Sequence, residues 1–437
     1  MYMTSLAIFT RDLRLNDNPV LHAAAPDAVP VFIADPMAES LHGSPNRQAY
    51  LAECLRDLDA SLRAGGSALV LRRGPWVDTI LALLAESDAS AIHVARDVTA
   101  FSQKRIELLR HRSPVPVTIH DSLTVVPPDA LAPATSDFYQ VFTPFHRRWI
   151  ARDWRPMLAP PTLATHAIGS DPLPAMDDVG TSPARHRGGE TAARLDMDRW
   201  IPRSRRYEHT RNDLGIDGTS RLSAALHFGT LSPLEVALRT GEAGADAYVR
   251  QIAWRDFNHQ VLYHRPEAST TNYRNQEVEW NDDPAAFEAW TAGATGFPIV
   301  DAAMRELTAT GYMHNRARMV TASFLTKDLM IDWRLGARHF MTWLTDGDVA
   351  NNQLGWQWVA GTGTDTNPTR IFNPTLQSER FDTDGDYIRR WLPELADVET
   401  GEIHDPSPLT RAATGYPLPI VDHREAIRAF KDARGFS

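Results

Sequence analysis

The sequence predicts an α/β domain followed by an all-helical domain, and three observations support this prediction. Short apolar runs alternate with helical patterns in the first part of the chain. A long segment rich in Pro, Ala, Gly, Ser and Thr follows, and only helical patterns occur from about Ser220 onward. At 437 residues the chain also exceeds the size at which one hydrophobic core stops growing, so two domains or more are expected.

Residues 1–130 are expected to form a doubly wound parallel α/β domain of the Rossmann-like type. Apolar runs predict strands over residues 6–10, 29–34, 68–71, 91–95 and 115–120, and helical patterns between them include residues 49–64 and 77–86. Strict alternation of strand and helix is typical of a parallel sheet with helices on both faces. The usual Gly-rich dinucleotide and triphosphate loops are missing from this sequence.

Residues 131–198 are expected to connect this domain to a helical domain at 199–437. Within the connector, residues 157–187 show no periodicity and are typical of a surface segment. Beyond it, Ser232 is predicted to cap a helix whose first turn contains a proline. Residues 246–263 and 298–308 carry apolar side chains at helical spacing. All-helical domains build cofactor sites from side chains on facing helices.

The composition indicates a cytoplasmic protein without a metal centre. The single cysteine, Cys54, excludes an internal disulfide and a Cys-rich zinc site, and it fits a reducing compartment. No apolar run is long enough to span a bilayer, and the N-terminal residues become charged too soon for a secretory signal. We therefore expect no membrane association.

The charge of the chain restricts how it can meet nucleic acid. A formal net charge of -10 argues against a protein that coats nucleic acid through bulk electrostatics. A local basic patch occurs at residues 199–211, where five arginines stand against one acid, Glu208. This patch is a candidate phosphate-binding surface, and a solvated face is about as compatible with its composition.

Residues 311–361 concentrate the side chains that suggest a functional pocket. Trp333, Trp356 and Trp358 lie there among carboxylates, asparagines and arginines. Each residue alone fits core packing or helix capping, but the combination indicates a cofactor pocket. Trp356 and Trp358 are separated by one residue, so they cannot share one helix face and are expected to serve different neighbours.

Two further patterns belong with this pocket. Residues 218–223 (GTSRLS) place hydroxyls and free backbone N–H groups at a helix start, which suits a pyrophosphate. Simple capping is the commoner use of such residues and is favoured in isolation. Arg318, on a helix starting near Asn315, would need a carboxylate if buried, and Asp346 or Asp348 could supply it.

Several long motifs in order make the sequence resemble the photolyase and cryptochrome flavoproteins, and the class I cyclobutane pyrimidine dimer photolyases most. The motifs are FTRDLRLNDN at residues 9–18, VFTPF at 141–145, GTSRLS at 218–223, WRD at 254–256, GFPIVDAAM at 296–304, and the stretch at 311–361. The resemblance covers almost the whole chain. It implies an N-terminal antenna domain and a helical catalytic domain that holds FAD noncovalently in a U shape, active as FADH⁻.

The resemblance implies a set of FAD-binding residues. They are Tyr207, Thr219, Ser220, Arg221, Leu222 and Ser223 on the phosphate side, Tyr248, and Asn315, Arg318, Asp346, Asp348 and Asn352 around the isoalloxazine. Asn352 matches the position facing flavin N5. Photolyases typically have Asn there, plant cryptochromes Asp and animal cryptochromes Cys, so this residue favours repair.

The resemblance also implies an electron path and a substrate site. Trp356, Trp333 and Trp280, from flavin to surface, match the triad that photoreduces the flavin. The positions that line the dimer pocket are Gln251, Trp254, Asn315, Met319 and Trp358, and those that contact DNA are Arg211, Arg316, Arg370 and Gln377. A monomer that flips a dimer out of UV-damaged DNA and cleaves it with an electron from light-excited flavin is expected.

Three departures qualify the resemblance. Gln251 replaces the usual Glu, which removes a charge and a proton source but keeps a hydrogen-bonding group, so weakened repair is expected. The loop around Asn367–Arg370 is one residue shorter than usual, which affects the match of Arg370. Around Thr99 the residues of a folate antenna site are missing, so 8-hydroxy-5-deazaflavin or no antenna is expected rather than methenyltetrahydrofolate.

Three alternative functions remain open at this point. A cryptochrome-type photoreceptor would use the same FAD and tryptophans without repair; Gln251 is compatible with it, whereas the short chain after residues 417–421 lacks a long signalling tail. A (6-4) photolyase is disfavoured, because Asn315 and Met319 stand where those enzymes carry two histidines. Dark electron transfer would leave the dimer-pocket residues without a use.

Overall fold

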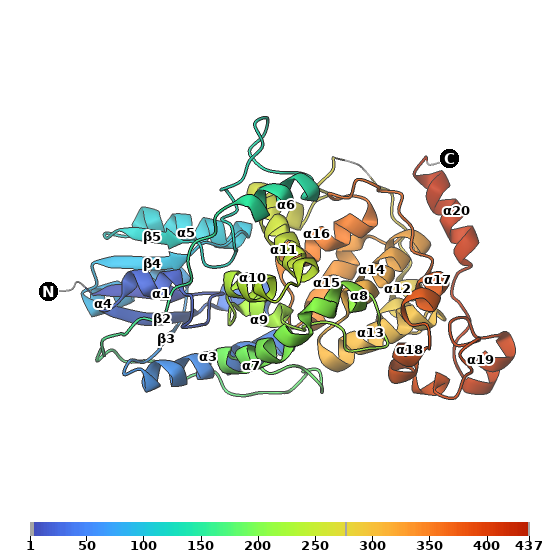
Figure 1. Cartoon of the computed structure of the whole chain (residues 1–437), viewed down its shortest axis with the longest axis horizontal. Coiled ribbons are helices and arrows are strands. Elements are labelled where there is room, and N and C mark those ends of the chain that lie inside the picture. Colours follow the sequence, from blue (N-terminus) through green and yellow to red (C-terminus); the bar gives the residue numbers. More distant parts are fainter. Residues whose placement is uncertain (1–3, 276–277, 436–437) are drawn as a thin grey trace.

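The computed structural model describes residues 4–275 and 278–435. It shows an α/β domain and an all-helical domain (Figure 1). The α/β domain occupies one end of the elongated molecule, and helices alone form the other end. The predicted fold class is therefore confirmed. In the described part of the chain, no helix is long and apolar enough to cross a membrane.

The N-terminal sheet has five parallel strands in the order β3-β2-β1-β4-β5. The strands are β1 Ser5–Phe9, β2 Ala28–Ala34, β3 Val70–Arg73, β4 Ala91–Ala95 and β5 Val117–His120. The third strand begins later than predicted, because Leu69 N–H donates to Asp59 Oδ1 (3.0 Å) instead of joining the ladder.

Helices cover both faces of the sheet, as alternation along β1 requires. Ala7 and Phe9 pack with α1 (Pro19–Ala24) and α3 (Pro45–Ala64), whereas Leu6 and Ile8 pack with α4 (Trp76–Ser87) and α5 (Ala100–Arg112). A short α2 (Pro36–His42) precedes α3. The carboxyl ends of the strands face the helical domain in Figure 1.

The segment between the two domains contains two helices at its margins. α6 (Phe142–Ala151) packs on the helical domain, where Phe142 stacks on Trp254 with ring centroids 3.7 Å apart. Residues 152–188 have no regular secondary structure and lie along the α/β domain, as when Asp171 N–H donates to Leu71 O (2.9 Å). α7 (Glu190–Trp200) then leads into the helical domain.

In the helical domain, the other helices pack around the long helix α11 and the shorter helix α16. Its elements are η1 Ile201–Arg206, α8 Tyr207–Thr210, α9 Ser223–Phe228, α10 Pro233–Glu242, α11 Asp246–His264, η2 Pro266–Ser269, α12 Pro284–Ala292, α13 Pro298–Thr310, α14 Asn315–Ser323, η3 Phe324–Asp328, α15 Trp333–Trp343, α16 Val349–Ala360, α17 Pro374–Phe381, α18 Asp386–Trp391, η4 Pro393–Leu395, α19 Pro408–Thr414 and α20 His423–Ala433. Ser232 caps α10 as predicted, its Oγ accepting from Glu235 N–H (3.3 Å).

Buried polar contacts join α11 to the α/β side of the molecule. Asp256 Oδ2 accepts from the backbone N–H groups of Val125 (2.9 Å) and Val126 (3.0 Å) and from Trp149 Nε1 (2.9 Å). Burial raises the pKa of Asp256 to about 6, although these hydrogen bonds act in the opposite direction. Asp256 therefore fixes the position of the helix that carries Gln251 and Trp254.

Candidate functional site

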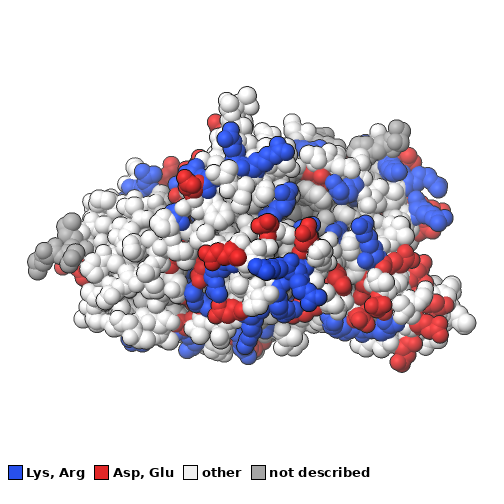
Figure 2. Space-filling model, in the orientation of Figure 1, with Lys and Arg blue, Asp and Glu red and all other residues white. Residues whose placement is uncertain are grey.

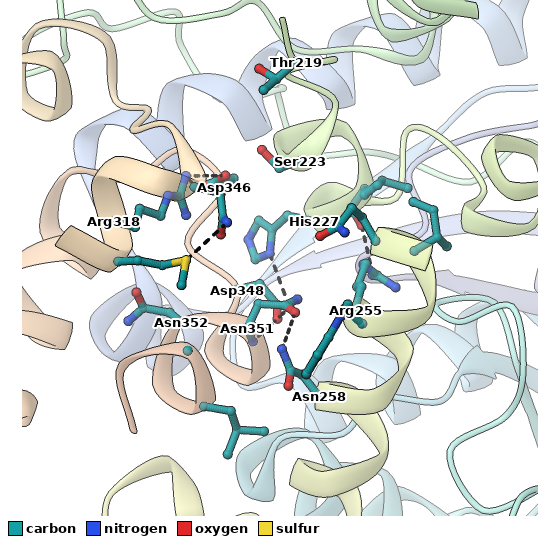
Figure 3. A pocket seen from close by; sticks show the side chains of 18 of the residues that line it. Thr219, Ser223, His227, Arg255, Asn258, Arg318, Asp346, Asp348, Asn351 and Asn352 are labelled. Atoms are coloured by element: carbon teal, nitrogen blue, oxygen red, sulfur yellow. Dashed lines mark hydrogen bonds and ion pairs between the residues drawn. The ribbon is translucent and has the colours of Figure 1, made fainter. Parts of the chain in front are cut away.

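A cavity of about 500 Å³ lies in the helical domain among α8, α9, α11, α14 and α16 (Figure 3). Most residues that the sequence predicts for the site line it together. They are Tyr207, Arg211, Thr219, Ser220, Arg221, Leu222, Ser223, Tyr248, Gln251, Trp254, Asn315, Arg318, Met319, Asp346, Asp348, Asn352, Trp356 and Trp358. Five predicted residues lie outside its lining: Trp280, Trp333, Arg316, Arg370 and Gln377.

One end of the cavity is lined with hydroxyl groups. Ser220 Oγ lies 2.7 Å from the Tyr248 hydroxyl, and Thr219 Oγ1 lies 3.3 Å from the Tyr312 hydroxyl. Arg221 has a positive φ of 54°, so the loop turns sharply just before α9. Burial raises the pKa of Tyr207 to about 12, so its phenol stays protonated.

Simple capping, the use favoured for residues 218–223 in isolation, accounts for only part of their contacts. The residue before α9 is Leu222, whose side chain does not cap the helix, but Ser220 Oγ accepts from Leu222 N–H (3.2 Å). The hydroxyls of Ser220 and Thr219 also contact tyrosines on the cavity wall. Hydroxyl groups on a concave wall next to a helix start suit a phosphate-bearing ligand.

Arg318 and Asp346 form the ion pair that the sequence left open between two carboxylates. Arg318 Nη2 donates to both oxygens of Asp346 (3.0 and 2.8 Å), and its Nε donates to Met313 O (2.8 Å). Burial alone would lower the pKa of Arg318, but Asp346 outweighs burial and raises it. The cavity therefore holds a permanent cation with a fixed orientation.

Asp348 links the cavity to the α/β domain. Its Oδ2 accepts from Arg11 Nη1 (2.9 Å), which follows β1, and its Oδ1 caps α16 by accepting from Asn351 N–H (2.8 Å). Burial alone would raise the pKa of Asp348, but His259 and Arg11 hold it well below its usual range. Burial lowers the pKa of His259 to about 4, so Arg11 is the permanent cation of this group.

The amide of Asn352 is held with its nitrogen against the protein. Nδ2 donates to Ala337 O (3.1 Å) and Gln353 Oε1 (3.0 Å). Its carbonyl oxygen is then the atom free to accept a hydrogen bond from a ligand. Gly355, one turn further along α16, lines the cavity, and a Cβ there would meet nothing within 4 Å.

The opposite side of the cavity is aromatic and partly exposed. Trp254 lines it with one face stacked on Phe142, and Trp358 lies under the guanidinium of Arg370, 5.1 Å from ring centroid to Cζ. Among the described residues, none hydrogen-bonds the Gln251 amide, which also lines this side. Flat rings and an available amide suit recognition of an unstacked base.

Trp280 and Trp333, the two predicted tryptophans that do not line the cavity, lie in the same hydrophobic core as Trp356. Trp333 is fully buried, and its Nε1 donates to Asn272 Oδ1 (2.9 Å). A Cβ on Gly336 would approach Trp356 Cη2 to 2.3 Å, so this glycine allows α15 and α16 to pack closely around the indole. Trp280 is partly buried on the same core.

The predicted basic patch is divided between two roles. Arg211 lines the cavity, whereas Arg199 pairs with Asp196 (3.1 Å), and Arg203 Nη1 lies 3.9 Å from Asp217 Oδ2. Blue and red side chains are interspersed in the middle of the face shown in Figure 2. Two of the five arginines therefore lie beside carboxylates on the surface, as the alternative interpretation expects, and one lines the cavity.

Arg316 and Gln377, two further predicted DNA contacts, do not line the cavity. Arg316 Nη2 donates to Asn212 Oδ1 (2.9 Å), and its guanidinium lies 4.3 Å over the Phe381 ring. These two contacts fix the position of the guanidinium. Gln377 lies on α17, and its Oε1 is buried without a partner in the described part of the chain.

Several lining residues are not among those predicted from the sequence. Tyr312, His227, Arg255, Asn258 and Asn351 also line the cavity. A signal existed for two of them, because Arg255 and Asn258 follow Gln251 by four and seven residues on one helix face. No pattern marks Tyr312 or His227, which reach the site through tertiary packing.

The Arg11–Asp348 pair yields a stability prediction. Arg11→Met should destabilise the protein by about 3–5 kcal/mol, because it leaves a buried carboxylate without its cation. The depressed pKa of Asp348 contributes stability above its unfolded value that is lost as pH falls, and this acid dependence should shrink in the variant. Urea unfolding at several pH values measures both effects. In the Arg11→Met/Asp348→Asn double variant, the two losses should not add; additive losses would contradict the pairing.

Comparisons with known proteins agree with this architecture. Residues 5–163 match the family model described as DNA photolyase, and residues 248–434 match the FAD binding domain of DNA photolyase. A deoxyribodipyrimidine photo-lyase of Streptomyces griseus is 47% identical over 99% of both chains.

Two solved structures share the whole fold. A bacterial class III photolyase from Agrobacterium tumefaciens gives a TM-score of 0.90 at 33% identity, covering 100% of this chain and 98% of that one. A Synechocystis cryptochrome gives a TM-score of 0.90 at 29% identity, covering 99% of each chain. On this evidence, the chain belongs to the photolyase and cryptochrome family of FAD-binding proteins.

Proposed function

We propose that this chain repairs cyclobutane pyrimidine dimers in DNA with light absorbed by bound FAD. The observation that carries the proposal is the two-sided cavity. Its inner side holds a fixed cation, carboxylates and an amide, and its outer side is an aromatic mouth that could admit a flipped-out dimer. Substrate and cofactor would meet inside one cavity without water between them.

The cavity residues fit FAD. Trp356 Nε1, on the cavity lining, is buried without a hydrogen-bond partner in the described part of the chain. The hydroxyls of Thr219 and Ser220 lie at one end, where they would bind the phosphates, and Arg318 would lie beside the isoalloxazine. The bound flavin supplies the light-driven electron that the protein itself cannot provide.

The chain's own residues would orient both partners. The carbonyl oxygen of Asn352 would accept from a ring N–H and so hold a proton there. Trp254 and Trp358 would stack on the flipped bases, and the neutral amide of Gln251 would hydrogen-bond a base edge. Asn352 and the aromatic mouth favour repair over the cryptochrome alternative, which the shared fold alone does not exclude.

We also propose that Trp356, Trp333 and Trp280 form the photoreduction path. Supporting this, Trp356 lines the cavity, Trp333 is buried beyond it, and Trp280 is partly exposed. Asn281, next to Trp280, pairs with Ile331 in an isolated bridge, which brings the last two tryptophans into one neighbourhood.

A second cavity of about 210 Å³ supports an antenna site, proposed for 8-hydroxy-5-deazaflavin. It lies outside the carboxyl ends of β1, β2 and β4, where the strand order reverses and ligands of such sheets bind. Arg105 lies 4.6 Å over the Trp76 ring, and its Nε is buried without a hydrogen-bond partner in the described residues. A cation against aromatic walls suits a flat anionic chromophore.

Gly355→Leu tests the cavity as the FAD site. The added side chain would project into open cavity, so FAD content after purification should fall at least about tenfold, on the scale of a lost close contact. The absorbance ratio of flavin to protein measures this. Gly401→Leu, also without neighbours within 4 Å, is the matched control and should retain FAD. Full FAD loading in Gly355→Leu would place the cofactor elsewhere.

Repair is tested with reduced protein and a UV-damaged oligonucleotide under blue light. Light-dependent loss of dimers is expected, and its absence would refute the proposed function. Gln251→Glu should tighten dimer binding or raise the repair yield by about threefold to tenfold, the scale of one charge-assisted hydrogen bond. An unchanged variant would show that this residue does not reach the lesion.

Trp356→Phe separates photoreduction from repair. Replacing the indole should slow photoreduction of oxidised flavin at least about a hundredfold, since phenylalanine is far harder to oxidise and the barrier rises by several kcal/mol. Repair by chemically reduced protein should persist. Transient absorption and a repair assay provide the two measurements, and normal photoreduction would indicate another electron path.

A further inference from the structure

Lys327 is an unusual cation in this chain. The sequence contains only three lysines, Lys104, Lys327 and Lys431, among 45 Lys and Arg residues. Lys104 and Lys431 are exposed, whereas Lys327 is 1% exposed. Burying an ammonium group is costly, so a buried lysine requires a specific contact that repays it.

Lys327 lies on η3, a single π-helical turn that directly continues α14. Such turns are rare and frequently occur at functional sites. Nζ donates to the backbone oxygen of Arg370, and the Phe430 ring lies 5.7 Å from it. Among the described residues, no carboxylate forms an ion pair with Nζ. Burial lowers the pKa of Lys327 to about 8, with Asp365 acting in the opposite direction.

The carbonyl that Lys327 binds belongs to the loop between α16 and α17. This loop is also fixed to the end of α14, because Phe372 N–H donates to Ser323 Oγ (3.3 Å). The Arg370 side chain remains 42% exposed, pairs with Asp365 (3.2 Å) and covers the Trp358 ring. The backbone at Arg370 is thus held by Lys327 and by the neighbouring contact of Phe372. The guanidinium of Arg370 lies over Trp358, which lines the cavity.

The C-terminal helix α20 closes the other side of Lys327. Phe430 is the one residue of α20 that is fully buried, and it packs against the ammonium. Near the other end of α20, His423 Nδ1 pairs with Asp328 Oδ1, the residue next to Lys327. The helix therefore contacts η3 at Lys327 and at the residue that follows it, and it keeps water from the ammonium.

We propose that Lys327, covered by α20, is a positioning residue for lesion binding: it holds the loop carbonyl so that Arg370 and Trp358 form the DNA-contacting rim. This rests on the proposed function. Arg370 would contact a phosphate beside the flipped dimer, where a guanidinium is well suited. A lysine fits the anchor because one compact ammonium serves one carbonyl, whereas a guanidinium brings five donors that need partners.

The first test needs no DNA. Lys327→Met keeps the length of the side chain and removes the donor, and the loss of a buried charge makes retained folding expected. Hydrogen exchange of residues 362–373 should become about tenfold faster, equivalent to one lost hydrogen bond, while α14 and α16 stay protected. Lys104→Met and Lys431→Met are the matched controls. Unchanged exchange would show that Lys327 does not hold this loop in place.

The second test measures binding of a UV-damaged oligonucleotide in the dark. Lys327→Met and Arg370→Ala should each weaken binding about tenfold and reduce the salt slope by about one phosphate contact. The double variant should bind no more weakly than Arg370→Ala alone; additive losses would overturn the link between the two residues. Phe430→Ala, which keeps the ammonium but uncovers it, should loosen the loop less than Lys327→Met does.

The two tests distinguish this inference from the proposed function. If the unaltered protein binds no damaged DNA, the proposed function fails, and with it the role of the rim. Whether Lys327 holds the loop in place is still decided by the exchange measurement. Faster exchange confined to the loop supports it, and unchanged exchange rejects it.

Discussion

The ionised carboxylate of Asp348 is the contact on which the rest of the site depends. One oxygen accepts from Arg11 at the end of β1, and the other caps α16. A single buried charge therefore joins the α/β domain to the helix that carries Asn352, Trp356 and Trp358. Because a buried carboxylate is tolerated only with a cation and hydrogen bonds, the two domains are held in one relative position.

The same constraint explains the other charged groups around the cavity. Arg318 is half-buried beside Asp346, and Asp256 accepts three hydrogen bonds from the segment that follows β5 and from α6. Each of these contacts uses a local polar group to fix a helix that carries site residues. These contacts fix the helices of the site because they join parts of the chain that are distant in sequence.

Features that depend on residues close together in the sequence could be predicted, whereas contacts between residues far apart in the sequence could not. Periodicity predicted the parallel sheet and the helices, because both depend on local spacing. The Arg11–Asp348 pair joins residues 337 positions apart, which no local pattern reveals. Residues 218–223 illustrate the limit: their composition favours capping, yet tertiary contacts with tyrosines determine their use. The π turn at Lys327 also lacks a local signal. The assignments of the triad and of the DNA contacts came from resemblance and stay predictions.

Helix α16 shows how one element can serve a dry cofactor site and an open substrate site. Asn352, Trp356 and Val359 recur at helical spacing and are buried, whereas Asn351 and Trp358, seven residues apart, lie on the adjacent face and are partly exposed. Both faces line the cavity. The two tryptophans that cannot share a face therefore meet different partners in one space: Trp356 lies against the core through which an electron would enter, and Trp358 lies at the mouth under Arg370. A one-residue shift in this helix would exchange the faces, so the cap at Asp348 also sets which tryptophan lies at the mouth of the cavity.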